Sequence, residues 1–79
     1  MIDDKLRGIL KKHLNIPEII DGIGQEDILT GLGYNSLVFI KIVLDIEEEF
    51  DMEFRDEDLS YLQFPTLKSL IDYIKENSD

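Results

Sequence analysis

The chain has 79 residues, of which 18 are acidic and 8 basic, so its formal net charge at pH 7 is −10. This charge argues against binding to nucleic acids or anionic membranes, and it predicts attraction to basic protein surfaces. The absence of cysteine excludes disulfides and thiolate metal sites, and no apolar run approaches the ~20 residues that span a bilayer. We therefore expect one domain over residues 1–79 that acts as a monomer in the cytoplasm.

A first helix is predicted near the start of the chain. Its apolar residues recur at helical spacing: Ile2, Leu6, Ile9, Leu10 and Leu14. Asp3 or Asp4 is expected to cap this helix, and Pro17 is expected to end it because proline disfavours helical geometry in the residue before it. His13 is the only histidine and has no cysteine partner, which favours a surface or helix-end position over catalysis or metal binding.

Residues 15–35 form a connection that is longer than a compact domain usually tolerates without a purpose. It carries several apolar residues: Ile16, Ile19, Ile20, Ile23, Ile28, Leu29 and Leu32. We therefore expect the connection to pack on the core, with a short helical turn over residues 25–29.

The segment Gly31-Leu32-Gly33-Tyr34-Asn35-Ser36-Leu37 predicts a turn, followed by a helix from Ser36 to about Phe50. At 100° per residue this helix has a long apolar stripe, which we expect in the core: Phe39, Ile42, Val43, Ile46 and Phe50. A shorter stripe begins beside the serine: Leu37, Ile40 and Leu44. The shorter stripe either covers the long connection or is exposed for a partner, and the residues alone favour the first.

Residues 45–58 contain nine acidic side chains and a single basic one, Arg55. The spacing of Asp51, Glu53 and Arg55 does not fit a calcium-binding loop, which needs an oxygen ligand at the third of these positions. We therefore predict no metal site, and we interpret the segment as a solvated or partner-facing acidic flank.

Beyond this helix, Met52 and Phe54 alternate with charged residues, which is typical of an extended segment that inserts one side chain and exposes the next. Residues 56–59 predict the start of a short third helix, with acidic groups at its positive end. Thr66 is expected to cap the last helix, which has its own apolar stripe: Leu67, Leu70, Ile71 and Ile74. These elements predict an all-α bundle of three main helices and one short helix.

Ser36 is the strongest candidate for a functional residue, although a serine before an apolar helix is most often only an N-cap. Residues 32–37, followed by residues 46–54, resemble the acyl and peptidyl carrier proteins. That family has a Gly-x-Asp/Asn/His-Ser-Leu turn before an apolar helix, which ends in a Leu-Glu-Glu-x-Phe-like stretch. The resemblance continues through residues 56–59 and 66–74 and so covers essentially the whole chain.

The resemblance implies a four-helix carrier-protein bundle in which Ser36, flanked by Asn35 and Leu37, is esterified by a 4′-phosphopantetheine arm. A phosphopantetheinyl transferase would attach this arm from coenzyme A. The thiol of the arm would hold an acyl or aminoacyl group as a thioester, which an adenylating ligase loads and condensing or tailoring enzymes use. Such a protein carries its cargo and does not catalyse, which agrees with the lack of a nucleophile–histidine or acid–base pair near the serine.

The resemblance also implies a docking face beside the serine for these partner enzymes. The residues at the matching positions are Leu37, Ile40, Lys41, Leu44, Glu47, Glu48 and Phe54. This implication favours exposure of the shorter apolar stripe.

Three residues depart from the fatty-acid carriers: Asn35 replaces an aspartate, and Val38 and Lys41 replace common acids. These departures favour a free-standing peptidyl-type carrier in a nonribosomal peptide or related thiotemplated pathway. The alternatives are an acyl carrier of fatty-acid or polyketide synthesis and, in another class, an unmodified helical interaction domain in which Ser36 is only a cap. A small enzyme is disfavoured, because the chain offers one histidine, no cysteine and no room for a deep pocket.

Overall fold

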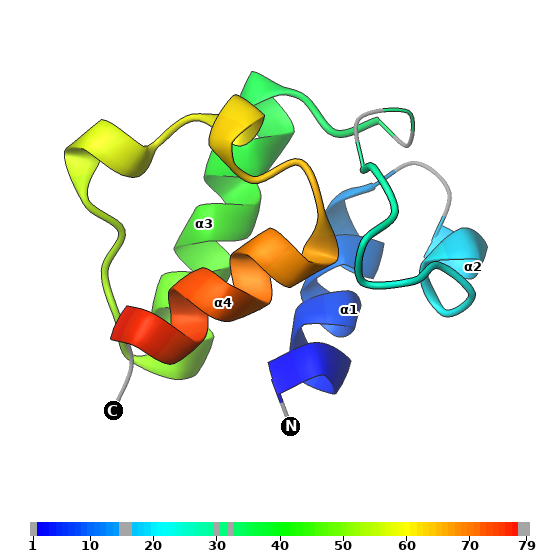
Figure 1. Ribbon diagram of the computed structural model, residues 1–79, viewed down its shortest axis with the longest axis horizontal. Coiled ribbons are helices and arrows are strands. Elements are labelled where there is room, and N and C mark those ends of the chain that lie inside the picture. The colour runs from blue at the N-terminus through cyan, green and yellow to red at the C-terminus, as the bar shows by residue number, and fades with distance from the viewer. Residues whose placement is uncertain (1, 15–16, 30, 32, 78–79) are drawn as a thin grey trace.

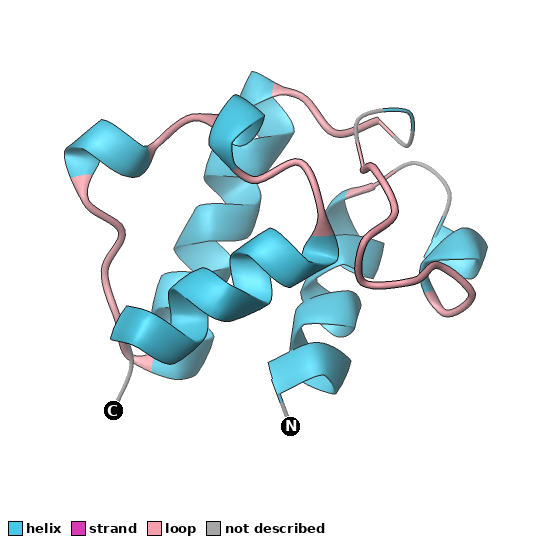
Figure 2. Cartoon of the chain, viewed as in Figure 1, coloured by secondary structure: helices cyan, strands magenta, loops and turns pink. Residues whose placement is uncertain are grey.

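The computed structural model describes residues 2–14, 17–29, 31 and 33–77. Its α-helices are α1 (Ile2–His13), α2 (Pro17–Ile20), α3 (Ser36–Phe50) and α4 (Leu67–Asn77), and its short 3-10 helices are η2 (Asp56–Asp58) and η3 (Tyr61–Gln63). Helix α1 packs against α3 and α4, and α4 crosses in front of α3 in the view of Figures 1 and 2. The described residues contain no β-strand, so the predicted all-α bundle is confirmed.

Helix α1 presents its predicted apolar face to the core, where Leu6 and Leu10 are fully buried. The prediction that Asp3 or Asp4 caps this helix is wrong, because the helix begins at Ile2 and both acids lie in its first turn. Asp3 instead accepts a hydrogen bond of 2.6 Å from Nε of Arg7, one turn later. The guanidinium of Arg7 also donates to the backbone carbonyls of Ile20 and Ile23, and so it fastens the connection that follows α1.

The connection between α1 and α3 folds back over the start of α4. A helical turn forms at Pro17–Ile20 and not over residues 25–29, so the predicted position of this turn is wrong. Residues 25–28 instead make a non-helical turn that pairs with the segment before α4. Its hydrogen bonds run from Leu29 N to the carbonyl of Pro65 (2.8 Å) and from Lys68 N to the carbonyl of Gln25 (2.7 Å).

The expected packing of this connection on the core is confirmed in part. Ile20 and Leu29 are fully buried, whereas Ile19 and Ile28 are exposed. Ile16 and Leu32, which we also expected to pack inward, lie outside the described residues.

Helix α3 has the bounds that its sequence predicted. Its long stripe enters the core as expected: Phe39, Ile42, Val43 and Ile46 are buried, and Phe50 is partly buried. The ring of Phe39 lies at the centre of an aromatic group, stacked on Phe64 and edge-on to Tyr34 and Phe54. This group joins the start of α3 to the segments on both sides of η2 and η3.

The segment between α3 and α4 behaves partly as predicted. Met52 and Phe54 are buried while Glu53 between them is exposed, which confirms the extended alternation. The short helix expected over residues 56–59 forms as the 3-10 turn η2, and η3 follows as a second one. Thr66 caps α4 as predicted, because its Oγ1 accepts a hydrogen bond of 3.1 Å from the backbone N of residue 69.

Candidate functional site

The turn before α3 places the Ser36 hydroxyl at the helix N-terminus and leaves it exposed. Gly33 has φ of 88°, in the left-handed region that glycine tolerates best. Asn35 has an extended backbone, and its Oδ1 accepts a hydrogen bond of 3.0 Å from Val38 N. Asn35 is therefore the N-cap, and the alternative in which Ser36 serves as the cap is wrong. Among the residues that the structure describes, no hydrogen bond engages the Ser36 side chain.

Tyr34 anchors this turn from the inside. Its ring is only 3% exposed and meets Phe39 and Tyr61 edge-on, with 6.0 Å between ring centroids in each pair. Its hydroxyl donates a hydrogen bond of 2.8 Å to the backbone carbonyl of Phe64. Burial raises the pKa of the Tyr34 phenol above its ordinary value of 10.0, so the hydroxyl remains a donor to a higher pH than an exposed tyrosine. Sequence reasoning missed this residue, because a single tyrosine in a turn carries no periodic signal.

The shorter apolar stripe of α3 is exposed. The exposed fractions are 68% for Leu37, 38% for Ile40 and 59% for Leu44. The residues alone favoured covering of this stripe by the 15–35 connection, and that prediction is wrong because the connection pairs with the segment before α4 instead. The exposure implied by the family resemblance is confirmed.

The other residues of the predicted docking face divide between surface and interior. Lys41 and Glu48 are exposed on α3. Glu47 is partly buried, and its Oε2 accepts a hydrogen bond of 2.8 Å from the backbone N of Phe54. The placement of Phe54 on the docking face is wrong: its ring is 6% exposed and stacks on Tyr73 with 4.6 Å between centroids. The extended backbone turns this side chain inward together with Met52.

Polar side chains of α1 and α3 contact each other away from Ser36. His13 Nε2 lies 2.7 Å from Oδ2 of Asp45, and Lys12 Nζ lies 3.2 Å from the same oxygen. The hydrogen bond with His13 is the main cause that lowers the pKa of the Asp45 carboxyl. The expected helix-end position of His13 is confirmed, since it is the last residue of α1.

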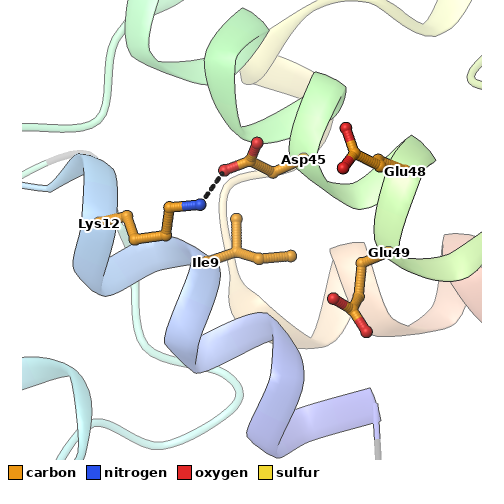
Figure 3. Close-up of a pocket in the computed structure, with 5 residues that line it drawn as sticks. All are labelled: Ile9, Lys12, Asp45, Glu48 and Glu49. Carbon is orange, nitrogen blue, oxygen red and sulfur yellow. Dashed lines mark ion pairs between the residues drawn. The ribbon is translucent and has the colours of Figure 1, made fainter.

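A cavity of about 230 Å³ opens beside this cluster, lined by Ile9, Lys12, Asp45, Glu48 and Glu49 (Figure 3). Within the described part of the chain, no three histidine, cysteine or acidic side chains are grouped so that they could hold a metal ion. In the same residues, no helix is long and apolar enough to cross a membrane.

Comparison with known proteins identifies the family. Residues 4–74 match the family model described as "Phosphopantetheine attachment site". The chain belongs to this family. It is 36% identical over 70 residues to an aminoacyl carrier protein from Agrobacterium fabrum (strain C58), a match that covers 89% of this chain and 84% of the relative. It is also 34% identical over 77 residues to an acyl carrier protein from Buchnera aphidicola subsp. Schizaphis graminum, covering 98% and 94% of the two chains.

A solved structure has the same fold. It is the crystal structure of an engineered Bradyrhizobium japonicum glycine:[carrier protein] ligase complexed with ATP and with a carrier protein from Agrobacterium tumefaciens. The match has a TM-score of 0.82 and 33% sequence identity, and it covers 96% of this chain and 99% of the matched chain. The predicted carrier-protein bundle is therefore confirmed.

The family membership establishes what the carrier protein does. It bears a 4′-phosphopantetheine arm, carries acyl or aminoacyl groups on it, and is not itself a catalyst. The described turn fits such an arm, because an exposed hydroxyl stands at the N-terminus of α3 where the helix dipole favours a phosphodiester. The arm would supply the thiol, and the exposed Ser36 hydroxyl is an oxygen to which it could be joined.

Proposed function

We propose that Ser36 is the residue that carries the phosphopantetheine arm. The observation that supports this most strongly is the exposed hydroxyl at the start of α3, which makes no described hydrogen bond while Asn35 caps the helix beside it. Because Asn35 performs the structural role, the serine is left free for modification. Leu37 follows directly on the outer face of the helix and begins the exposed stripe.

We further propose that partner enzymes dock on the outer face of α3. Its exposed residues are Leu37, Ile40, Lys41, Leu44 and Glu48. Glu47 lies at its edge and is partly engaged with the segment after the helix. A contiguous apolar stripe on a small acidic protein is typical of an interaction surface, and here it begins at the proposed attachment residue.

The cargo we propose is an aminoacyl group, held in a nonribosomal peptide or related thiotemplated pathway. The support is the similarity to an aminoacyl carrier protein and to a carrier protein solved in complex with a glycine:[carrier protein] ligase. An adenylating amino acid ligase is then the loading partner, after a phosphopantetheinyl transferase and before condensing or tailoring enzymes. The similarity to an acyl carrier protein over 77 residues supports the second candidate, an acyl carrier of fatty-acid or polyketide synthesis. The monomeric state and the cytoplasmic location stay predictions.

Modification tests the attachment residue. The apo protein is incubated with coenzyme A, Mg²⁺ and a promiscuous phosphopantetheinyl transferase, and its intact mass is measured. We expect the mass of one arm to be added to the wild type and to Ser60→Ala, and none to be added to a folded Ser36→Ala. An arm that still appears on Ser36→Ala would overturn the assignment, and an unmodified wild type would favour the helical interaction domain.

Loading tests the cargo class. The holo protein is incubated with ATP, glycine and the Bradyrhizobium japonicum glycine:[carrier protein] ligase, and the product is treated with hydroxylamine, which cleaves thioesters. We expect a glycyl adduct that hydroxylamine removes and that Ser36→Ala lacks. Absence of this adduct, together with loading by a malonyl-coenzyme A transacylase, would favour the acyl carrier of fatty-acid or polyketide synthesis.

A further inference from the structure

A single cation lies beside the exposed apolar stripe of α3. Lys41 lies one helical turn after Leu37 and just under one turn before Leu44, so the three side chains share one face. Both leucines are more than half exposed. On a chain with a net charge of −10, this places a positive charge at the edge of the exposed apolar stripe near Ser36.

Among the described residues, Lys41 has no acidic partner on its own helix. The acid one turn ahead of Lys41 is Asp45, whose carboxylate is held by His13 and Lys12 of α1 at 2.7 and 3.2 Å. Figure 3 shows Asp45 directed toward Lys12 across the gap between the two helices. The residue one turn behind Lys41 is Leu37, which offers no charge.

Most other lysines have an acidic partner within the described residues: Lys5 with Glu49, Lys11 with Asp21, Lys12 with Asp45, and Lys68 with Asp72. No ion pair or hydrogen bond of the Lys41 ammonium is found among the same residues. Its charge therefore faces solvent and remains available to a partner.

We propose that the adenylating ligase of this carrier presents a carboxylate opposite Lys41, between apolar contacts for Leu37 and Leu44. The ion pair between Lys41 and this carboxylate would determine which ligase the carrier binds. The inference rests on the proposed function, which supplies the class of partner. Docking would remove water from the ammonium, and an unpaired cation in an apolar contact is costly. A ligase with a carboxylate at this point offsets that cost, whereas one with a basic residue there is repelled.

The charges along α3 also give the contact a direction. Lys41 lies on the half of the face nearer Ser36, and Glu48 lies one turn beyond Leu44. The complementary ligase surface therefore has its carboxylate closer to the arm and its basic group farther away. Such an order fixes the register in which the serine approaches the catalytic centre of the ligase.

The test compares holo proteins that each carry one arm, verified by mass, in glycine loading by the Bradyrhizobium japonicum ligase. We expect Lys41→Glu to lower kcat/KM by about tenfold or more, chiefly through a higher KM, and Lys41→Gln to have an intermediate effect. Lys41→Arg should retain most of the activity. Lys75→Glu makes the same charge change on α4 and serves as the matched control, with an expected change of less than about twofold.

A second measurement asks whether the partner group is a carboxylate. A carbodiimide joins an amine to a carboxylate without a spacer, so treatment of the carrier–ligase mixture followed by peptide mapping identifies such pairs. We expect a cross-link from Lys41 to an aspartate or glutamate of the ligase. A map in which other lysines cross-link to the ligase and Lys41 does not would overturn the proposal.

The outcomes separate this inference from the proposed function. One outcome is that the wild type is loaded, Ser36→Ala is not, and Lys41→Glu is loaded as well as the wild type. This outcome would overturn the role of Lys41 and leave the proposed function intact. Faster loading of Lys41→Glu than of the wild type would reverse the sign of the expected partner charge and overturn it as well. A fully modified wild type that the ligase does not load overturns the ligase partnership, and this inference with it, while leaving the attachment at Ser36 intact.

Discussion

Replacement of Tyr34 by phenylalanine tests whether the turn that presents Ser36 is anchored from the core. The substitution keeps a ring that is 3% exposed and removes only the hydroxyl that donates to the carbonyl of Phe64 over 2.8 Å. Phe64 is itself 5% exposed, so this carbonyl loses its donor in a place with little access to water. A buried acceptor left without a partner costs about 1–3 kcal/mol. For a chain of this size each kcal/mol lowers Tm by about 4–8 °C.

Tyr61→Phe is the matched control for this substitution. Its ring meets that of Tyr34 edge-on, but no hydrogen bond of its side-chain hydroxyl is found among the described residues. Thermal unfolding followed by circular dichroism should give a Tm near that of the wild type for Tyr61→Phe and one about 10 °C lower for Tyr34→Phe. Equal Tm values for the two variants would refute the anchoring role of the Tyr34 hydroxyl.

The same residue predicts a pH dependence. Burial raises the pKa of Tyr34 in the folded chain above the ordinary value of 10.0. The folded state therefore keeps this proton at a pH where the unfolded state releases it, and unfolding becomes easier as the pH rises above about 10. The free energy of unfolding, measured by urea titration from pH 8 to 11, should fall at the alkaline end. Tyr34→Phe should show a smaller fall, since its ring has no proton to lose.

Three further predictions concern α3 and its neighbours. Asn35→Ala should lower the free energy of unfolding by about 0.5–2 kcal/mol and Ser36→Ala by much less, because Asn35 is the cap; urea titration giving the reverse order would contradict this assignment. Val43→Glu should lower the free energy of unfolding by about 3–5 kcal/mol, because the Val43 side chain is only 3% exposed. Leu44→Glu changes a side chain that is 59% exposed, so Tm should stay within a few degrees of the wild type while cargo transfer is impaired. Asp45→Asn should lower the free energy of unfolding by less than about 1 kcal/mol at neutral pH, since the Lys12–Asp45 ion pair is partly exposed. This difference should shrink as the pH falls below the ordinary carboxyl value of 3.8 and vanish once Asp45 is protonated, because the hydrogen bond with His13 lowers the Asp45 pKa. A difference that persists after Asp45 is protonated would contradict the role of the ionised carboxylate.

Periodic features were predictable from the sequence. The bounds of α3 and the burial of its long stripe follow from apolar spacing, and the alternation around Glu53 follows from the period of an extended chain. The family was recognisable because residues 32–37 and 46–54 combine a turn motif with a fixed spacing. These features depend on local order along the chain, which the sequence displays directly.

Features that depend on tertiary contacts were not predictable in the same way. Asn35 and Ser36 are both good capping residues, and only the backbone geometry shows that Asn35 performs this role. Phe54 was placed on the docking face by resemblance, whereas its own alternation with charge already indicated burial. The exposure of Leu44 depended on where a distant connection would lie, and the residues of α3 carry no information about that.

The path of the connection between α1 and α3 explains why the turn before Ser36 is anchored and why the outer face of α3 is exposed. Its hydrogen bonds lead to Pro65 and to the first turn of α4, so the connection is bound on the α4 side and leaves the outer face of α3 uncovered. Two residues before its end the chain turns at Gly33, then Tyr34 is buried in the core, and two residues later Ser36 is exposed. The connection thus has two structural consequences: Tyr34 anchors the turn before Ser36 to the carbonyl of Phe64, and the apolar stripe beside Ser36 stays open to partners.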